Sequence, residues 1–185
     1  EITWVTGVQT CALPISELSR QISQAAASSG IGLTLLPVLY THAGFGGQAP
    51  NEGQRRFINS SEHYLDLQAR LKPILAAQPA QQLGLCFHSL RAVTPQQINE
   101  VLAASDKACP VHIHIAEQQK EVDDCLAWSG KRPLQWLYDN VDVDERWCLV
   151  HATHADPAEV TRMASSRAIA GLCLTTEANL GDGIF

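Results

Sequence analysis

The sequence lacks the features that mark several classes of protein. It has no run of about 18 apolar residues, so nothing in it predicts a membrane-spanning helix. Its net charge is −6, which excludes the basic surface that nucleic-acid binding requires. An anionic small molecule is still an allowed ligand, because cations in a pocket can outweigh the charge of the whole chain.

Cysteine pairs and nucleotide-binding loops are missing as well. The six cysteines form no CxxC pair, and several lie inside apolar runs, which predicts buried free thiols in a reducing compartment such as the cytoplasm. The glycines at positions 44, 46 and 47 lack the spacing and the following helix of a P-loop or a Rossmann turn. We therefore expect an ordinary connecting loop at that point.

The sequence does contain a regular alternation of strand-like and helix-like segments. Helical periodicity separates the strand-like runs, and Thr94-Pro95 and Asp156-Pro157 are typical helix starts. Pro37 indicates that the first strand ends early. The alternation predicts an α/β protein with a parallel sheet. The expected strands are residues 31–39, 83–87, 111–115, 147–150 and 168–174.

Histidines at the ends of successive expected strands favour a barrel over an open sheet. His88, His114 and His151 each follow such a run. A closed (β/α)₈ barrel gathers residues from strand ends around one axis, whereas an open sheet spreads them along an edge. Five strand–helix units are too few to close, so we expect a partial TIM-type barrel that contains about strands 3 to 7.

The segment from His112 to Glu117 carries the clearest chemical signal. His114 and Glu117 form an HxxE pattern at a strand-to-helix corner, which suits a metal ligand followed by a residue that exchanges protons with a metal-bound water. His112 lies on the same face as His114 and is expected to pack or to support it. The next strand ends at His151, which should point into the site, whereas His154 is expected in a loop.

Two candidate substrate-binding residues lie at the end of the preceding expected strand, residues 83–87. His88 ends the run and Arg91 follows it in a loop on the same side of the sheet. An arginine there can bind a carboxylate through its planar pair of donors. We therefore expect Arg91 to contact an acidic substrate.

Four segments resemble the formimidoylglutamate deiminase family of the amidohydrolase superfamily. The resemblance covers about residues 17–185 and is specific to this family. The matching segments are Gly84-Leu-Cys-Phe-His-Ser-Leu-Arg-Ala-Val93, His112-Ile-His-Ile-Ala-Glu-Gln118, Leu149-Val-His-Ala-Thr-His154 and Thr176-Glu-Ala-Asn-Leu-Gly-Asp-Gly183.

The resemblance implies a zinc-dependent hydrolase that converts N-formimino-L-glutamate, a dianion, to N-formyl-L-glutamate and ammonia in histidine degradation. It implies that His114 is a zinc ligand, Glu117 the proton shuttle and His151 a catalytic residue near the attacking water. His88 and Arg91 would bind the glutamate part of the substrate. The family's other ligands, an HxH pair on the first strand and an Asp on the eighth, are not matched in this chain. A homodimer stays open for the full-length enzyme.

Two other interpretations stay open. A related zinc deaminase acting on a nucleobase or a triazine would share the HxxE pattern and the sixth-strand histidine, but would not need Arg91. The chain alone could also be a non-catalytic fragment, since it carries one ligand of the implied set. Residues 5–15 resemble a translated sequencing adapter, so we expect residues 1–15 to be non-native and residues 16–185 to form an incomplete hydrolase barrel.

Overall fold

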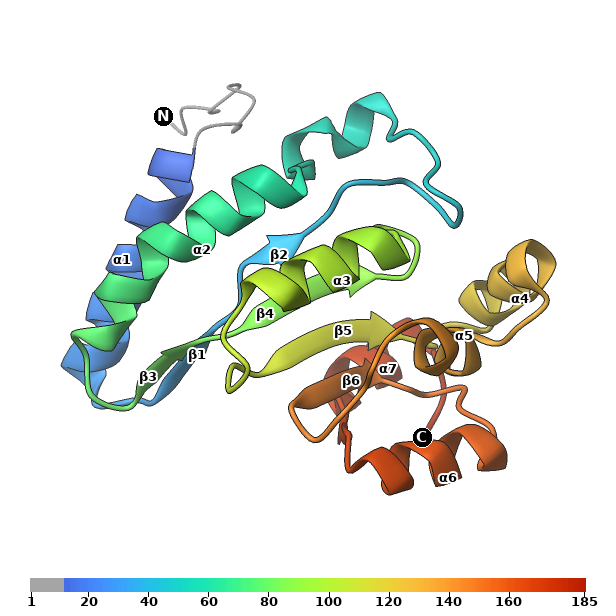
Figure 1. Ribbon diagram of the computed structural model, residues 1–185. Helices are drawn as coiled ribbons and strands as arrows, with labels where there is room; N and C mark the ends of the chain where they lie inside the picture. Colours follow the sequence, from blue (N-terminus) through green and yellow to red (C-terminus); the bar gives the residue numbers. More distant parts are fainter. Residues whose placement is uncertain (1–11) are drawn as a thin grey trace.

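The computed structural model describes residues 12–185, with side chains from residue 16 onward, as an arc of parallel strands (Figure 1). The main sheet has five strands in the order β2-β4-β5-β6-β7, and every neighbouring pair is parallel. Each new strand is added on the same side of the previous one. A doubly wound sheet would reverse direction at its switch point. The order therefore agrees with the predicted partial (β/α)₈ barrel.

The strands and helices alternate along the chain as expected. Thr94 and Asp156 both form capping boxes, each ahead of a proline in the first helical turn. The strands are β1 Leu33–Leu35, β2 Val38–Leu39, β3 Gln81–Leu83, β4 Leu85–Ser89, β5 Val111–Ile115, β6 Trp147–His151 and β7 Ile169–Gly171. The helices are α1 Ala12–Ser29, a 3₁₀ helix Glu52–Phe57, α2 Ser61–Ala76, α3 Pro95–Ala104, α4 Gln119–Ser129, α5 Pro133–Asn140, α6 Pro157–Ser166 and α7 Leu174–Leu180.

Two of the expected strands are each divided in two. Pro37 lies between the two parts of the first: β1 ends at Leu35, early as predicted, and the chain then resumes as β2, which pairs with β4. Gly84 divides the next strand into β3 and β4, and β3 pairs with β1. A Cβ atom at Gly84 would lie 2.7 Å from Leu36 Cδ2 and 3.0 Å from the Pro110 carbonyl oxygen. Only glycine fits this close approach.

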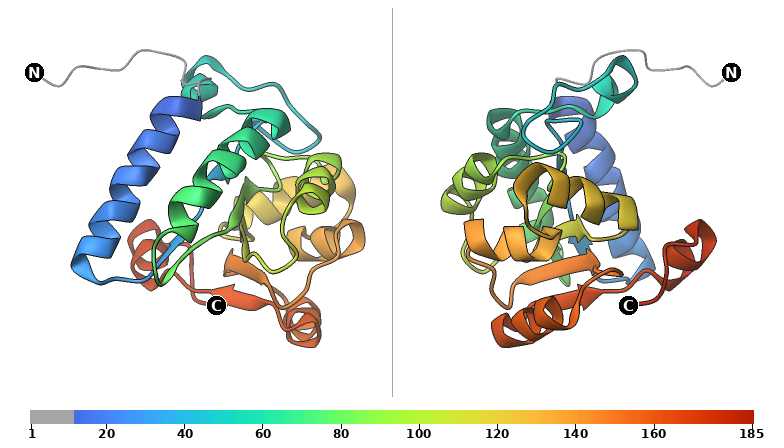
Figure 2. Two further views of the ribbon diagram at one scale, coloured as in Figure 1. Left: turned by 60° about the vertical axis from the view of Figure 1, so that its left-hand side comes forward. Right: turned by 90° about the vertical axis from the view of Figure 1, so that its right-hand side faces the viewer.

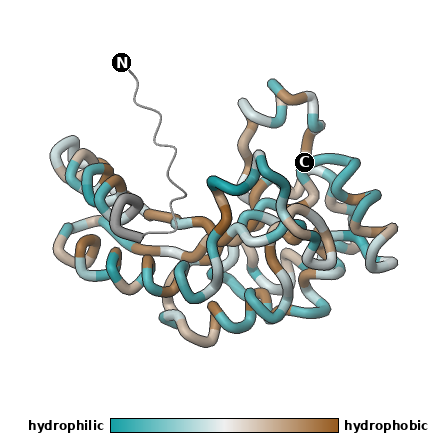
Figure 3. Tube along the Cα trace, turned by 90° about the horizontal axis from the view of Figure 1, so that it is seen from above, coloured by the Kyte–Doolittle hydropathy of each residue, from teal (hydrophilic) through white to brown (hydrophobic). Residues whose placement is uncertain are grey.

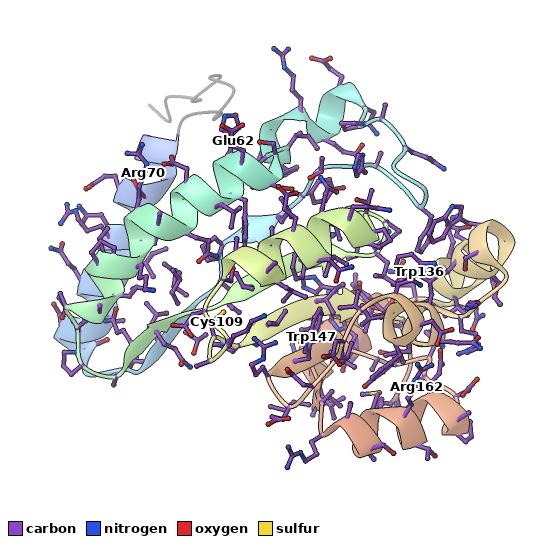
Figure 4. The ribbon with its side chains drawn as sticks, in the orientation of Figure 1. Glu62, Arg70, Cys109, Trp136, Trp147 and Arg162 are labelled. Carbon is purple, nitrogen blue, oxygen red and sulfur yellow. The ribbon has the colours of Figure 1, made fainter. Side chains whose placement is uncertain are left out.

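The core lies between the sheet and the helices that cover its outer face. Alternate residues of β5, namely Val111, Ile113 and Ile115, are fully buried on that face. Trp147, labelled near the middle of Figure 4, is also fully buried and stacks on Phe87 with ring centroids 6.1 Å apart. In Figure 3 hydrophobic segments run through the middle of the molecule, and hydrophilic segments are frequent around its rim. This packing fixes the sheet from which the site residues project.

The last strand and the helix after it differ from expectation. The strand predicted at 168–174 is limited to β7, and the chain turns into α7 at Leu174. Helices α3 and α7 lie on opposite sides of the sheet (Figure 2). Of the segment predicted to be non-native, only residues 12–15 are described, and they form the first turn of α1. Among the described residues, no helix combines the length and the apolar character needed to cross a membrane.

Candidate functional site

The carboxyl ends of β4, β5 and β6 bring three imidazole rings into one row. The centroid of the His114 ring lies 5.4 Å from that of His88 and 5.6 Å from that of His151. Tyr40, which follows β2, meets the His88 ring edge-on at 4.6 Å. The strands are parallel neighbours, so their ends share one edge of the sheet. The structure thus brings together the three histidines singled out in the sequence.

A break in strand register sets the orientation of His114. The pairing of β4 with β5 shifts between Phe87 and Ser89, so His88 lies in a bulge. The carbonyl oxygen of His88 is 2.7 Å from Nδ1 of His114. A carbonyl can only accept a hydrogen bond, so Nδ1 carries the proton and Nε2 keeps a free lone pair. His114 therefore presents the tautomer that a metal ligand at Nε2 requires.

His151 lies between two carboxylates. Its Nδ1 is 3.0 Å from Oε1 of Glu177 in α7, and its Nε2 is 3.4 Å from Oε1 of Glu117. The hydrogen bond from the backbone N–H of Cys173, and after it the one from His151, hold the pKa of Glu177 below its usual range. His151 has a φ of +71°, a left-handed conformation that is uncommon outside glycine. Such strain is concentrated at functional sites.

Glu117 lies in the corner between β5 and α4. The helix begins at Gln119, two residues after Glu117, so Glu117 lies at the strand-to-helix corner expected from the sequence. The residue before it, Ala116, has a φ of +50°. Two corner amides donate to the carboxylate of Glu121: Ala116 N–H to Oε1 at 3.1 Å and Glu117 N–H to Oε2 at 3.2 Å. The corner is therefore fixed by a side chain from the first turn of the following helix.

His88 and Arg91 flank this group from the end of β4. Burial, then His114, then Arg91 lower the pKa of His88 to about 4, so its imidazole is neutral at pH 7. Nε of Arg91 is buried and has no hydrogen-bond partner among the described residues. Arg91 lines a pocket of about 660 Å³ together with Gln48, Gln118 and Glu121. Arg91 therefore borders a pocket beside the row of histidines, and neither these histidines nor Glu117 lines that pocket.

The remaining two histidines of these segments lie outside the row. His112 is half-buried on the same face of β5 as His114, between Cys86 and Cys148 on the neighbouring strands. Burial and the neighbouring His114 lower its pKa. His154 lies in the turn after β6, and its carbonyl oxygen accepts a hydrogen bond from Arg132. The side chains of both stay outside the row, although the His154 N–H donates to the carbonyl oxygen of Ala116, the residue before Glu117, at 3.0 Å.

One group of three side chains in the described part of the chain has its donor atoms close enough to share a metal ion. His151, Cys173 and Glu177 each offer a ligand atom, and these lie within 4.8 Å of one another. Oε1 of Glu177, however, already accepts from His151 Nδ1 at 3.0 Å and from the Cys173 backbone N–H at 2.8 Å. Burial also raises the pKa of Cys173, which keeps the thiol protonated. These contacts explain the group as a hydrogen-bond network around His151.

Sequence reasoning assigned no role to three neighbours of the site. Glu121 follows Glu117 at i+4 in a first helical turn, and this spacing is a signal that could have identified it. Glu177 lies within a family-matching segment, but only the turn into α7 brings it to His151. Tyr40 reaches His88 across the junction of two strands that are far apart in sequence.

Comparison with known proteins gives a consistent family. The model of the amidohydrolase family matches residues 9–185. A formimidoylglutamate deiminase from Pseudomonas aeruginosa is 75% identical over 170 residues, which are 92% of this chain and 37% of that protein. A 5-methylthioadenosine/S-adenosylhomocysteine deaminase from Halobacterium salinarum is 32% identical over 98 residues, or 52% of this chain and 23% of that protein. The chain therefore spans little more than a third of the first of these relatives.

Comparison with solved structures points to the same family. An amidohydrolase from Brucella melitensis matches with a TM-score of 0.88 and 56% identity, over 92% of this chain and 38% of that one. An adenosine deaminase from Xanthomonas campestris with bound zinc matches with a TM-score of 0.71 at 21% identity, over 91% of this chain and 36% of that one, which shows a shared fold only. With the family model matched along nearly its whole length, this chain belongs to the amidohydrolase family.

Proposed function

We propose that the complete enzyme containing this segment hydrolyses N-formimino-L-glutamate to N-formyl-L-glutamate and ammonia, as a step of histidine degradation in the cytoplasm. The observation that carries this proposal is the 75% identity to the P. aeruginosa deiminase across the whole cluster of His88, His114, Glu117 and His151. The free cysteines among the described residues support a reducing compartment.

The side chains suit one divalent metal ion, which we propose to be zinc. His114 would hold it through Nε2, because Nδ1 is committed to the carbonyl of His88 at 2.7 Å. A zinc ion in such a site lowers the pKa of a bound water toward neutrality. The remaining ligands would come from parts of the complete enzyme that this chain does not contain.

The proposed roles of the protein side chains follow from their geometry. Glu117 takes the proton from the attacking water and returns it to the departing nitrogen, which leaves as ammonia. His151 hydrogen-bonds the water on the side opposite Glu177, since Glu177 occupies its Nδ1. Oxygen is thereby added to the formimino carbon as its bond to nitrogen breaks.

Substrate recognition is assigned to the end of β4. Arg91 carries a permanent charge and a buried Nε without a partner among the described residues, so it would bind a substrate carboxylate. His88 is neutral and would donate or accept a single hydrogen bond. An enzyme of net negative charge can in this way bind a dianion.

The test is a chimera in which residues 16–185 replace the matching segment of the P. aeruginosa enzyme. We expect ammonia release from formiminoglutamate and none from guanine or cytosine. The second candidate is a purine deaminase, favoured by the 32% identity to a 5-methylthioadenosine/S-adenosylhomocysteine deaminase. Turnover of methylthioadenosine with none of formiminoglutamate would replace the first proposal with the second.

A further inference from the structure

Glu121 is a buried carboxylate that the proposed chemistry does not use. Only 4% of it is exposed, although it lies in the first turn of a surface helix. Burial raises its pKa, and the charge of Arg91 is the largest of the effects that lower it. Ionised side chains are rarely buried without a specific partner. A buried acid at this position therefore calls for an explanation in its surroundings.

Its two oxygens bind two successive backbone amides. The Ala116 N–H donates to Oε1 at 3.1 Å and the Glu117 N–H donates to Oε2 at 3.2 Å. Ala116 adopts a φ of +50°, which is unfavourable for a residue with a side chain. Successive amides turned toward one side form a concave site for an anion. The carboxylate of Glu121 fills that site from within the protein.

This arrangement bears directly on Glu117. Because its own amide is tied to Glu121, the backbone of Glu117 is fixed at one end of α4. Its carboxylate then reaches His151 Nε2 at 3.4 Å. Its side chain is partly exposed, at 19%, and no other protein hydrogen bond to that carboxylate is found in the described part of the chain. The backbone, rather than the side chain, is therefore what is held rigidly.

We propose that Glu121 is a positioning residue, which holds the strained Ala116–Glu117 corner so that the Glu117 carboxylate faces His151. The catalytic part of this inference rests on the proposed function. Its structural part concerns the corner alone. Because a displacement of about 1 Å at a reacting group can cost about 100-fold in rate, a loosened corner should lower turnover.

The matched control is Glu159 in the first turn of α6, a glutamate that is 5% exposed. It too accepts from two backbone amides, Gln135 N–H at 3.2 Å and Asp156 N–H at 3.0 Å. It lies after β6 on the corner that carries no proposed catalytic carboxylate. A Gln substitution at either position replaces one carboxylate oxygen by an amide nitrogen, which can no longer accept from a backbone N–H.

The first experiment measures amide hydrogen exchange by NMR in the 185-residue chain. E121Q leaves one accepting oxygen, so it should accelerate exchange of at least one of the Ala116 and Glu117 amides by about tenfold or more. E159Q should do the same to at least one of the Gln135 and Asp156 amides and leave 116 and 117 unchanged. Unchanged protection at Ala116 and Glu117 in E121Q would overturn the inference. This readout does not depend on which substrate the enzyme takes.

The second experiment measures kinetics in the chimera. E121Q should lower kcat for formiminoglutamate by roughly 10- to 100-fold with KM and zinc content unchanged, and E159Q should keep kcat within about twofold. If E121Q does not fold, E121D keeps the charge but is too short to reach both amides, and should show the same loss. A near-normal kcat in a folded E121Q or E121D chimera would contradict the inference. An unsubstituted chimera without any formiminoglutamate turnover would contradict only the proposed function.

Discussion

The corner after β5 (residues 116–121) and the corner after β6 (residues 151–159) begin in the same way and are completed differently. Each has a left-handed alanine directly after its strand, Ala116 and Ala152, both with φ +50°, and in the second corner the last strand residue, His151, is left-handed as well. Each is closed by a buried glutamate that binds backbone amides, Glu121 and Glu159 respectively. The shared device allows a strand to turn sharply into its helix.

The difference lies in charge compensation. Glu159 forms an ion pair with Arg132 at 2.9 Å, and Arg132 also donates to the carbonyl of His154. Glu121 has no ion pair in the described residues, and Arg91 nearby keeps a buried Nε without a partner. Arg132 is thus bound within the fold, whereas Nε of Arg91 has no partner among the described residues, which fits its proposed role in binding a ligand. In the described part of the chain, Glu121 is compensated only by the field of Arg91 and by backbone amides, whereas Glu159 has a direct ion pair.

Of the substitutions that test this comparison, the largest loss of activity is expected at Glu117. In the chimera, E117Q should keep zinc but lower kcat by about 10²–10⁴-fold, because Gln keeps the shape and removes the group that carries the proton. The control H114A should lose metal and activity together. Measuring zinc content together with steady-state kinetics distinguishes loss of the proton carrier from loss of the metal. A near-normal kcat in E117Q would show that the corner after β5 carries no catalytic carboxylate.

The two arginines provide the next test. R91M keeps much of the aliphatic stem but loses the donor pair, so kcat/KM for formiminoglutamate should fall about 10- to 100-fold, equivalent to about 1.5–3 kcal/mol, with the Tm unchanged. R132M should do the opposite: activity stays within about twofold, and the Tm falls by roughly 3–10 °C because Glu159 loses its partner. Equal effects of both variants on Tm and on kcat/KM would show that the corners do not differ in this way.

A smaller effect is expected from Glu177, which orients His151 from outside both corners. In E177Q the side-chain oxygen can still accept from Nδ1, but the charge that favours this orientation is gone. We expect kcat to fall about tenfold with little change in KM. E177A should fall further, since nothing then holds Nδ1. If E177A retained full kcat, His151 would not need an orienting partner.

The sequence predicted the parts of this molecule that depend on local pattern. Apolar runs and cap-plus-proline starts were sufficient to locate β5, β6, α3 and α6, and strand ends placed His88, His114 and His151 on one edge. Pro37 predicted that the first strand ends early, and β1 does end at Leu35, but no local pattern predicted that the chain returns to the sheet as β2.

The interactions that complete the site could not be predicted from local sequence pattern. The bulge that aims His114 depends on the register between two strands, and the contact of Glu177 with His151 depends on a turn many residues away. Such contacts join residues distant in sequence, and one chain without an alignment contains no direct signal for them. Glu121 is the exception, since an acidic residue in the expected first turn of a helix is a local signal that could have identified it.

The smallest effect is expected from residues 1–15. We propose that residues 1–15 derive from an adapter, so they have no evolved packing partner, although residues 12–15 extend α1 by one turn. Deleting them from the 185-residue chain should change the Tm by no more than about 2 °C, since frayed terminal turns contribute little to global stability. The control deletion of residues 1–29, which removes α1 entirely, should lower the Tm clearly, because Ser23 of α1 donates to the Gln81 side chain of β3 at 2.7 Å and accepts from it through its backbone carbonyl at 2.8 Å. A loss of several degrees on removing residues 1–15 alone would show that this segment is native and packed.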